Sequence, residues 1–182
     1  MIVDKIKKRD PSPKNKPNRI DIPVGKWIKC DGCKEIIYKE SLWSNMNICP
    51  NCGHYFRMHI NRRLEQIIDE GTYKKFDLNI ETSNPLEMED YTRKLKALRE
   101  KTGLEEAVAC GTGKINDEDV VICIMDSGFL MGSMGSVVGE KITYAIEQAI
   151  EKKFPIIIFS VSGGARMQEG IISLMQMAKT TA

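Results

Sequence analysis

The sequence predicts an α/β protein in which a small four-cysteine zinc ribbon precedes part of a ββα spiral domain. Two observations lead to this class. Two Cys-x-x-Cys pairs, fifteen residues apart, lie between residues 27 and 56, and the elements from residue 106 onward read strand, strand, helix, strand, glycine turn, helix. Because two strands precede the first helix, the order departs from the strict alternation of a doubly wound sheet and favours a spiral of ββα turns.

The composition is that of an ordinary globular chain, with 182 residues, 42% of them hydrophobic, and a net charge of +2. This length allows one or two domains. No apolar run approaches the roughly 18 residues of a membrane span, and the N-terminus has no apolar signal-peptide core. We therefore expect a cytoplasmic protein without a membrane span, in which cysteines are metal ligands or free thiols.

Residues 1–25 hold seven Lys or Arg side chains among four prolines. Such a composition buries little surface and interrupts regular structure, so we expect a disordered basic tail. One interpretation of the tail is an electrostatic arm that binds nucleic acid or an acidic partner. The other is a leader that only increases solubility. A basic run this short favours the leader.

Residues 26–57 carry the most specific pattern in the chain. Each Cys-x-x-Cys pair can supply two thiolates from one tight turn, so the two pairs predict a tetrahedral zinc site. An iron–sulfur centre or a dithiol redox pair is the alternative, but two pairs at ribbon spacing favour zinc. Four thiolates leave no open position, so we expect one structural Zn²⁺ and interpret His54 and His59 as ordinary polar residues. The predicted metal ligands are Cys30, Cys33, Cys49 and Cys52.

Residues 58–105 read as a helical connector. Apolar residues fall on one face of two predicted helices, at residues 58–70 and 88–102, and a glycine follows each of them. Residues 73–80 are compatible with a short strand. The charged residues of the second helix resemble a solvated face, and we predict no chemistry in this segment.

Residues 106–182 contain the predicted spiral domain. It opens with two β-compatible runs, at residues 107–115 and 120–126, which we expect to pair as an antiparallel hairpin. Cys110 and Cys123 lie on these two runs. A disulfide between them is conceivable, but two buried thiols are the better interpretation for a cytosolic chain.

A glycine-rich loop at residues 127–139 leads into a helix predicted from about residue 140 to residue 152. The loop matches neither the GxGxxG pattern nor the phosphate-binding loop of nucleotide-binding proteins. Its N–H groups at the start of the helix could bind a phosphate or line a cofactor channel. Simple packing of the helix through glycine is the alternative.

Residues 154–170 combine a buried strand, the turn Gly163-Gly164 and a helix predicted at residues 165–177. A glycine turn at the edge of a sheet can present unpaired N–H groups to a developing oxyanion. A tight strand-to-helix connection without chemistry is the alternative. Two adjacent glycines do not decide between these interpretations.

These motifs, taken in order, resemble the beta subunits of bacterial acetyl-CoA carboxylase carboxyltransferase. The resemblance rests on the four-cysteine ribbon and on residues 131–139, 159–169 and 173–179. It implies a crotonase-like (ClpP/crotonase) domain behind the ribbon. It also implies transfer of a carboxyl group from carboxybiotin to acetyl-CoA, which forms malonyl-CoA for fatty-acid biosynthesis. The implied partners are an alpha subunit in an α2β2 complex, a biotin carboxyl carrier protein and a biotin carboxylase that uses ATP.

The same resemblance implies which residues act. The enolate of acetyl-CoA carries its charge on the thioester oxygen, where fixed backbone N–H groups can stabilise it. The implied donors are Gly163 and Gly164. A second donor usually comes from a later glycine turn that these residues lack, so we expect a truncated chain with an incomplete active site and no transferase activity, even with the alpha subunit present. The residues implied in substrate binding are Gly132, Ser133, Met134, Gly135, Ser136, Ala165 and Arg166.

Two other classes of function stay open. The ribbon and the basic tail also suit a nucleic-acid-binding zinc-ribbon module, whose affinity should fall steeply as the salt concentration rises. A purely structural partner subunit is the third hypothesis. It predicts no binding of acetyl-CoA.

Overall fold

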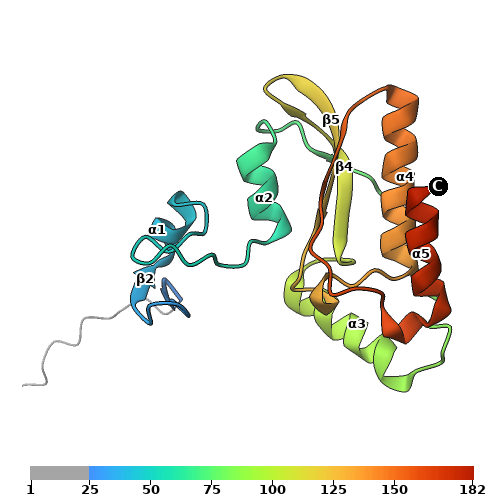
Figure 1. Cartoon of the computed structure of the whole chain (residues 1–182), viewed down its shortest axis with the longest axis horizontal. Helices are drawn as coiled ribbons and strands as arrows, with labels where there is room; N and C mark the ends of the chain where they lie inside the picture. Colours follow the sequence, from blue (N-terminus) through green and yellow to red (C-terminus); the bar gives the residue numbers. More distant parts are fainter. Residues whose placement is uncertain (1–24) are drawn as a thin grey trace, which may run out of the picture. The chain divides into compact units, whose positions relative to one another are not determined.

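The computed structural model describes residues 25–182 (Figure 1). The predicted basic tail, apart from Gly25, lies outside the described residues. The chain divides into two compact units, Met1–Phe56 and Arg57–Ala182. Among residues 25–182, none of the helices combines the length and the apolar character that a bilayer crossing needs.

The first unit is a small ribbon built on a two-stranded sheet. Strands β1 (Trp27–Lys29) and β2 (Ile36–Tyr38) pair antiparallel, and helix α1 (Lys39–Ser44) follows directly. Its apolar core is very small, as expected for a module that needs a metal to fold. The buried residues of this core are Cys30, Ile37, Leu42 and Cys49.

The second unit is organised around a four-stranded mixed sheet with the strand order β3-β4-β5-β6. The predicted hairpin is present, because β4 and β5 pair antiparallel along their whole length, whereas β6 joins β5 in parallel after a helical crossover. The strand predicted at residues 73–80 is reduced to two residues. The strands are β3 (Lys74–Lys75), β4 (Val108–Ile115), β5 (Glu118–Met125) and β6 (Ile156–Phe159).

Strand β5 is the centre of the core because it is buried on both faces. Its residues alternate between the two faces, as the two-residue period of a strand requires. Val120, Ile122 and Ile124 pack against helix α2 (Ile60–Ile67). The opposite face, with Val121, Cys123 and Met125, packs against helices α3 (Glu89–Thr102) and α4 (Ser136–Lys152).

The helices predicted for the connector at residues 58–105 are integral parts of this second unit. Helix α2 contributes Ile60 to the core on one face of the sheet, and α3 contributes Tyr91 and Leu95 on the other. Figure 1 shows α2 and α4 on opposite sides of β4 and β5, with α5 (Ile171–Thr181) beside α4.

Two helix boundaries differ from the prediction. Helix α4 begins at Ser136, four residues earlier than predicted, because the Glu169 carboxylate accepts the Ser136 N–H at its first turn. Helix α5 begins at Ile171 rather than at residue 165, because the chain first runs extended beside the glycine-rich loop. The Gly163-Gly164 turn is therefore not the start of a helix.

The two cysteines of the hairpin face each other across β4 and β5. Cys110 and Cys123 are register partners, both are buried, and both are free thiols. Contact with the Cys110 thiol, followed by burial, raises the pKa of Cys123 far above its ordinary value. The prediction of two buried free thiols is confirmed.

Candidate functional site

The four ribbon cysteines form a compact thiol cluster. The Sγ atoms of Cys30 and Cys52 lie 3.7 Å apart, those of Cys33 and Cys49 lie 3.8 Å apart, and all four lie within 4.8 Å of one another. A tetrahedral zinc ion with Zn–S bonds of about 2.3 Å separates its sulfurs by about 3.8 Å. The four thiols therefore fit the predicted closed zinc site, and neither histidine belongs to this group.

The two cysteine pairs adopt the same local turn. The residue after the second cysteine of each pair, Lys34 or Gly53, has a positive φ of 67° or 73°. Its N–H donates to the carbonyl of the first cysteine, from Lys34 to Cys30 and from Gly53 to Cys49, at 2.9 Å in both cases. Each turn thus holds its two sulfurs on one side, where a single ion can bridge both pairs.

The glycine-rich loop and the Gly163-Gly164 turn lie side by side in the second unit. The Gly163 N–H donates to the Met131 carbonyl at 2.9 Å, the Met134 N–H to the Gly164 carbonyl at 2.9 Å, and the Arg166 N–H to the Met134 carbonyl at 2.8 Å. This forms a short parallel bridge between residues 131–134 and 163–166. We call these two segments the paired loops.

The paired loops approach each other so closely that glycine is required. A Cβ atom placed on Gly132 would lie 1.9 Å from the Val161 carbonyl oxygen, and Gly132 also has a φ of +72°. The two preceding residues, Leu130 and Met131, have positive φ values of 45° and 56°. Three consecutive residues in the left-handed region make this a strained turn, of the kind that concentrates at functional sites.

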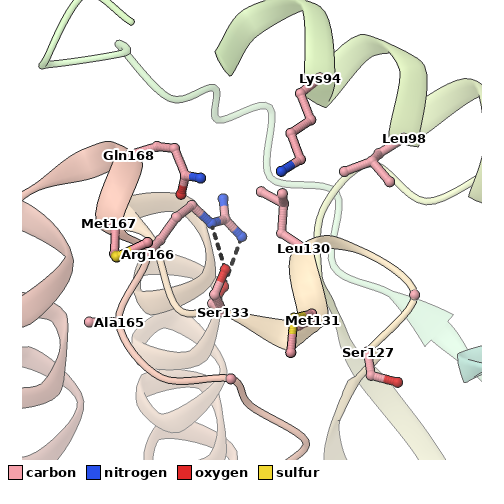
Figure 2. A pocket seen from close by; sticks show the side chains of 12 residues that line it. Lys94, Leu98, Ser127, Leu130, Met131, Ser133, Ala165, Arg166, Met167 and Gln168 are labelled. Carbon is pink, nitrogen blue, oxygen red and sulfur yellow. Dashed lines mark hydrogen bonds between the residues drawn. The ribbon is translucent and has the colours of Figure 1, made fainter. Parts of the chain in front are cut away.

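Arg166 is completely buried and is the centre of a polar network. Its Nη2 and Nη1 atoms donate to the Glu106 carboxylate at 2.6 and 2.9 Å. Nη2 also donates to the Ser133 carbonyl at 2.8 Å, and Nε to the Ser133 hydroxyl at 3.3 Å, as Figure 2 shows. Nη1 further contacts the Tyr91 hydroxyl at 3.3 Å and the Glu169 carboxylate at 3.5 Å. All three guanidinium nitrogens are thus bonded within the protein.

Glu169, three residues after Arg166, completes the network. Its carboxylate accepts the Tyr91 O–H at 2.6 Å and the Ser136 N–H at 2.6 Å, beside the α4 N-terminus where a negative charge is favourable. A Cβ on Gly135 would lie only 2.5 Å from Glu169 Oε1. The carboxylate therefore occupies the space that the missing side chain of Gly135 leaves.

The surroundings of Glu169 and Tyr91 shift the pKa values of both groups. Burial raises the pKa of Glu169, but hydrogen bonds from Tyr91 and Ser136 and the charge of Arg166 outweigh burial and lower the pKa below its ordinary value. Burial and the hydrogen bond to Glu169 raise the pKa of Tyr91 to about 12. At neutral pH Glu169 is therefore an anion and Tyr91 a neutral donor.

Asp126 holds the start of the glycine-rich loop against helix α2. Its carboxylate accepts the Gly128 N–H at 2.7 Å and the Ile60 N–H at 3.2 Å, and Oδ2 lies 3.1 Å from His59 Nδ1. His59, predicted as an ordinary polar residue, is thus one partner of a buried carboxylate. The contact fixes the first turn of α2 beside residue 128.

A pocket of about 420 Å³ lies between α3 and the paired loops (Figure 2). Four of the nine residues that the sequence predicts for oxyanion or substrate contacts line it, namely Ser133, Gly163, Ala165 and Arg166. The other lining residues are Lys94, Leu98, Ser127, Gly128, Leu130, Met131, Met167 and Gln168.

The five other predicted residues do not line this pocket, and they build the framework of the paired loops instead. Gly132 and Gly135 allow the close approaches described above. Met134 bridges the loops through its backbone, Gly164 accepts one of these hydrogen bonds, and Ser136 binds Glu169.

The loop N–H groups differ in their availability to a ligand. The Gly163 N–H is directed at the Met131 carbonyl, whereas the Gly164 N–H has only the exposed Ser162 hydroxyl at 3.1 Å. The Ala165 N–H has no hydrogen-bond acceptor within the part of the chain that the structure describes. Gly164 and Ala165 therefore have the N–H groups best able to bind an anionic oxygen.

Arg166, which the resemblance implies in substrate binding, borders the pocket but is held by protein groups. Its side chain is 0% exposed and its nitrogens are bonded to protein groups, so the geometry assigns it to support of the loops. Sequence reasoning missed its partners Glu106 and Tyr91, which lie far from it in the chain and belong to no local motif. Lys94 was also missed, because its helix reads as a solvated face.

The fold and the site together define a class of two-part α/β protein, in which a closed four-thiolate ribbon precedes a ββα unit with paired glycine loops. Residues 72–182 match the model of the carboxyl transferase domain, and residues 27–52 match that of the acetyl-CoA carboxylase zinc finger domain. The chain therefore belongs to the carboxyl transferase domain family.

Curated relatives agree with this membership. The chain is 58% identical over 168 residues to the acetyl-coenzyme A carboxylase carboxyl transferase subunits beta/alpha of Natranaerobius thermophilus, covering 92% of this chain and 28% of that protein. It is 54% identical over 165 residues to the corresponding subunit beta of Clostridium botulinum strain Kyoto, covering 91% of this chain and 57% of that protein. The chain thus spans just over half the length of that beta-subunit relative.

Solved structures show the same fold. A transcarboxylase 12S structure with hydrolysed methylmalonyl-coenzyme A superposes with a TM-score of 0.55 at 25% identity, over 68% of this chain and 22% of that chain. The predicted crotonase-like carboxyltransferase fold behind a zinc ribbon is confirmed by this likeness and by the two family matches.

Proposed function

We propose that the protein is a carboxyltransferase beta subunit of acetyl-CoA carboxylase, which transfers a carboxyl group from carboxybiotin to acetyl-CoA to form malonyl-CoA. The observation that carries this proposal is the combination, in one chain, of both family matches with a pocket bordered by the paired loops. Because the chain spans just over half of a beta-subunit relative, the transfer reaction is proposed for the assembled enzyme.

The pocket chemistry suits stabilisation of an acetyl-CoA enolate. Loss of a proton from the acetyl methyl group places negative charge on the thioester oxygen. The methyl carbon then bonds to the carboxyl carbon as the bond from that carbon to the carboxybiotin nitrogen breaks, and the proton ends on that nitrogen. Backbone N–H groups held in a fixed position stabilise such an oxygen without reorganising. We assign this task to the Gly163-Gly164 turn, in which Gly163 borders the pocket and the Gly164 N–H is the more available donor because its present partner is an exposed hydroxyl.

The buried network gives this turn its rigidity. Arg166 connects segment 163–166 to Glu106 before β4, and to the carbonyl of Ser133 in segment 131–134. Glu169, three residues after Arg166, binds the first turn of α4. An oxyanion donor is effective only when its position is set before the reaction, so we assign these side chains to positioning and not to contact with the substrate.

The proposal includes the partners of the reaction. An alpha subunit in an α2β2 complex, a biotin carboxyl carrier protein that presents carboxybiotin, and a biotin carboxylase that uses ATP complete the system, in the cytoplasm. The Natranaerobius thermophilus relative named as subunits beta/alpha supports pairing with an alpha subunit. The zinc ion is a structural component, since four thiolates leave it no open coordination position.

Binding of acetyl-CoA tests this function most directly. We expect saturable binding of acetyl-CoA, measured by isothermal titration calorimetry, and co-purification with a carboxyltransferase alpha subunit. Acetate at the same concentration should not compete, because it lacks the coenzyme. A protein that binds neither acetyl-CoA nor the alpha subunit would contradict the proposal.

Nucleic-acid binding by the ribbon is the second candidate, because this small unit exposes large aromatic side chains. Trp27, Trp43 and Tyr55 are 48%, 46% and 76% exposed, and aromatic side chains can stack on unpaired bases. RNA affinity measured at two salt concentrations, with and without residues 1–24, tests this candidate. Phosphate-driven binding weakens steeply with salt, whereas acetyl-CoA binding should not depend on the tail.

A further inference from the structure

The pocket beside the paired loops has an unbalanced charge. Its twelve lining residues include two cations, Lys94 and Arg166, and no carboxylate. Arg166 is neutralised by its buried contacts with Glu106 and Glu169. Within residues 25–182, Lys94 has neither a hydrogen bond nor an ion pair. The free positive charge of this pocket is therefore the Lys94 ammonium group.

The position of Lys94 is set by the way α3 is anchored. Tyr91, one turn earlier in the helix, is buried and donates its hydroxyl to Glu169 at 2.6 Å. Leu95 packs into the core beside it, and Leu98, one turn after Lys94, lines the pocket. Residues four apart share a helix face, so Lys94 and Leu98 face the pocket together. Figure 2 shows Lys94 extending from α3 toward Leu130 and Arg166.

We propose that Lys94 binds an anionic oxygen group of the ligand and thereby sets the specificity of the pocket; this inference rests on the proposed function. An unpaired ammonium group in a pocket that no carboxylate lines attracts an anion. The flexible side chain of lysine lets the ammonium group adjust to the position of the anion. Two parts of the reactants have this chemistry. They are the carboxylate that is transferred, present in malonyl-CoA, and the phosphates of coenzyme A.

Three probes separate these two sources. Acetylpantetheine carries neither anion, acetyl-CoA carries the phosphates, and malonyl-CoA carries the phosphates and the carboxylate. We expect Lys94→Gln to weaken the binding of the anionic probe by about tenfold or more, the usual size of a charge-assisted hydrogen bond. Lys94→Arg keeps the charge and should retain most of the affinity. Lys96→Gln, a change on the same helix outside the pocket lining, is the matched control and should bind all three probes like the wild-type protein.

The outcomes are distinct when calorimetry is carried out on the full chain. A loss confined to malonyl-CoA assigns Lys94 to the transferred carboxylate, and an equal loss for both coenzyme A thioesters assigns it to the phosphates. Unchanged binding of both thioesters by Lys94→Gln overturns the inference, and so does an equal loss for acetylpantetheine, which would indicate a structural effect. Failure of the wild-type protein to bind either thioester would instead contradict the proposed function itself.

Discussion

Arg166 and Glu106 form a two-point ion pair in the interior of the second unit. Two N–O distances of 2.6 and 2.9 Å join the guanidinium to the carboxylate, and the two side chains are 0% and 1% exposed. The pair connects the segment after Gly163-Gly164 to Glu106, which lies two residues before β4 and sixty positions earlier than Arg166 in the chain. A charged pair with so little access to water is stable only while both partners are present.

Replacing Arg166 alone should destabilise the protein strongly. Arg166→Met leaves the Glu106 carboxylate buried without its partner, which costs about 3–5 kcal/mol in comparable cases. Urea unfolding of the second unit, followed by circular dichroism, measures this loss. The double variant Arg166→Met with Glu106→Gln should recover part of it, because the buried Glu106 charge is then removed together with its partner, while Glu169 keeps its hydrogen bonds from Tyr91 and Ser136.

Arg93→Met is the matched control for this prediction. Arg93 pairs with Asp90 on the surface of α3, where the two side chains are 81% and 82% exposed. Such pairs contribute about 0–1 kcal/mol. If Arg166→Met cost no more than this control, the buried pair would have no structural importance.

Gly132→Ala should separate the paired loops. The added methyl group would lie 1.9 Å from the Val161 carbonyl oxygen, at a backbone φ of +72°, so one loop must move at a cost of about 2 kcal/mol or more. The Gly163 N–H, which donates to Met131, should then exchange faster with deuterium. Hydrogen exchange followed by NMR measures this rate.

The control for the loop prediction is Gly103→Ala at the end of α3. Gly103 has a similar φ of +69°, but a Cβ there would meet no atom within 4 Å. This variant should therefore cost only the backbone strain of about 1 kcal/mol and leave exchange at Gly163 unchanged. Equal exchange at Gly163 in both variants would show that the close contact at Gly132 does not hold the loops together.

The parts of the structure that the sequence predicts well are those encoded locally. The spacing of Cys30 and Cys33 by itself predicts half of a metal site. The turn of each Cys-x-x-Cys pair is closed by a hydrogen bond between residues of that same turn. The β4–β5 hairpin is equally local, with a turn at Asn116 and Asp117. In both cases the residues that interact lie within a short stretch of sequence, so the local pattern is enough to predict the structure.

The missed features depend on residues that are distant in the chain. The burial of Arg166 requires Glu106 and Tyr91, and no pattern around residue 166 indicates either of them. The late start of α5 has the same origin, because the paired loops keep the chain extended up to residue 166. Nothing in the sequence around Lys94 distinguishes it from other surface lysines, and its place at the pocket is evident only from the fold.

Removing the zinc should unfold the ribbon and leave the sheet unit intact. Both tryptophans of the chain, Trp27 and Trp43, lie in the ribbon, so tryptophan fluorescence reports on that unit alone. A chelator should shift this signal to that of solvated indole while most of the far-ultraviolet circular dichroism is retained, because the ribbon core is too small to fold without metal.

Zinc content gives the corresponding stoichiometric test. Cys30→Ser should lower the zinc measured by atomic absorption from one ion per chain to much less, since it removes one of the four thiols. Cys123→Ala removes a thiol from the sheet and should keep one ion per chain. Equal zinc loss in both variants would contradict the assignment of the metal to the ribbon.

Glu169 should make the stability of the second unit depend on pH. Burial raises its pKa, but hydrogen bonds from Tyr91 and Ser136 and the Arg166 charge outweigh burial and lower the pKa below the unfolded value of about 4.3. The folded state then binds fewer protons than the unfolded state, so the carboxylate adds stability above about pH 4.3 and loses it as the pH falls through the folded-state pKa. The unfolding free energies of the wild-type protein and Glu169→Gln should therefore differ most near neutral pH and converge as the pH falls through the folded-state pKa. Tyr91→Phe, which removes one donor to the carboxylate, should show a smaller difference that shrinks over the same range. Urea titrations at pH 7 and in the acid range measure both effects, and a difference for Glu169→Gln that did not change with pH would show that the charge of Glu169 does not stabilise the fold.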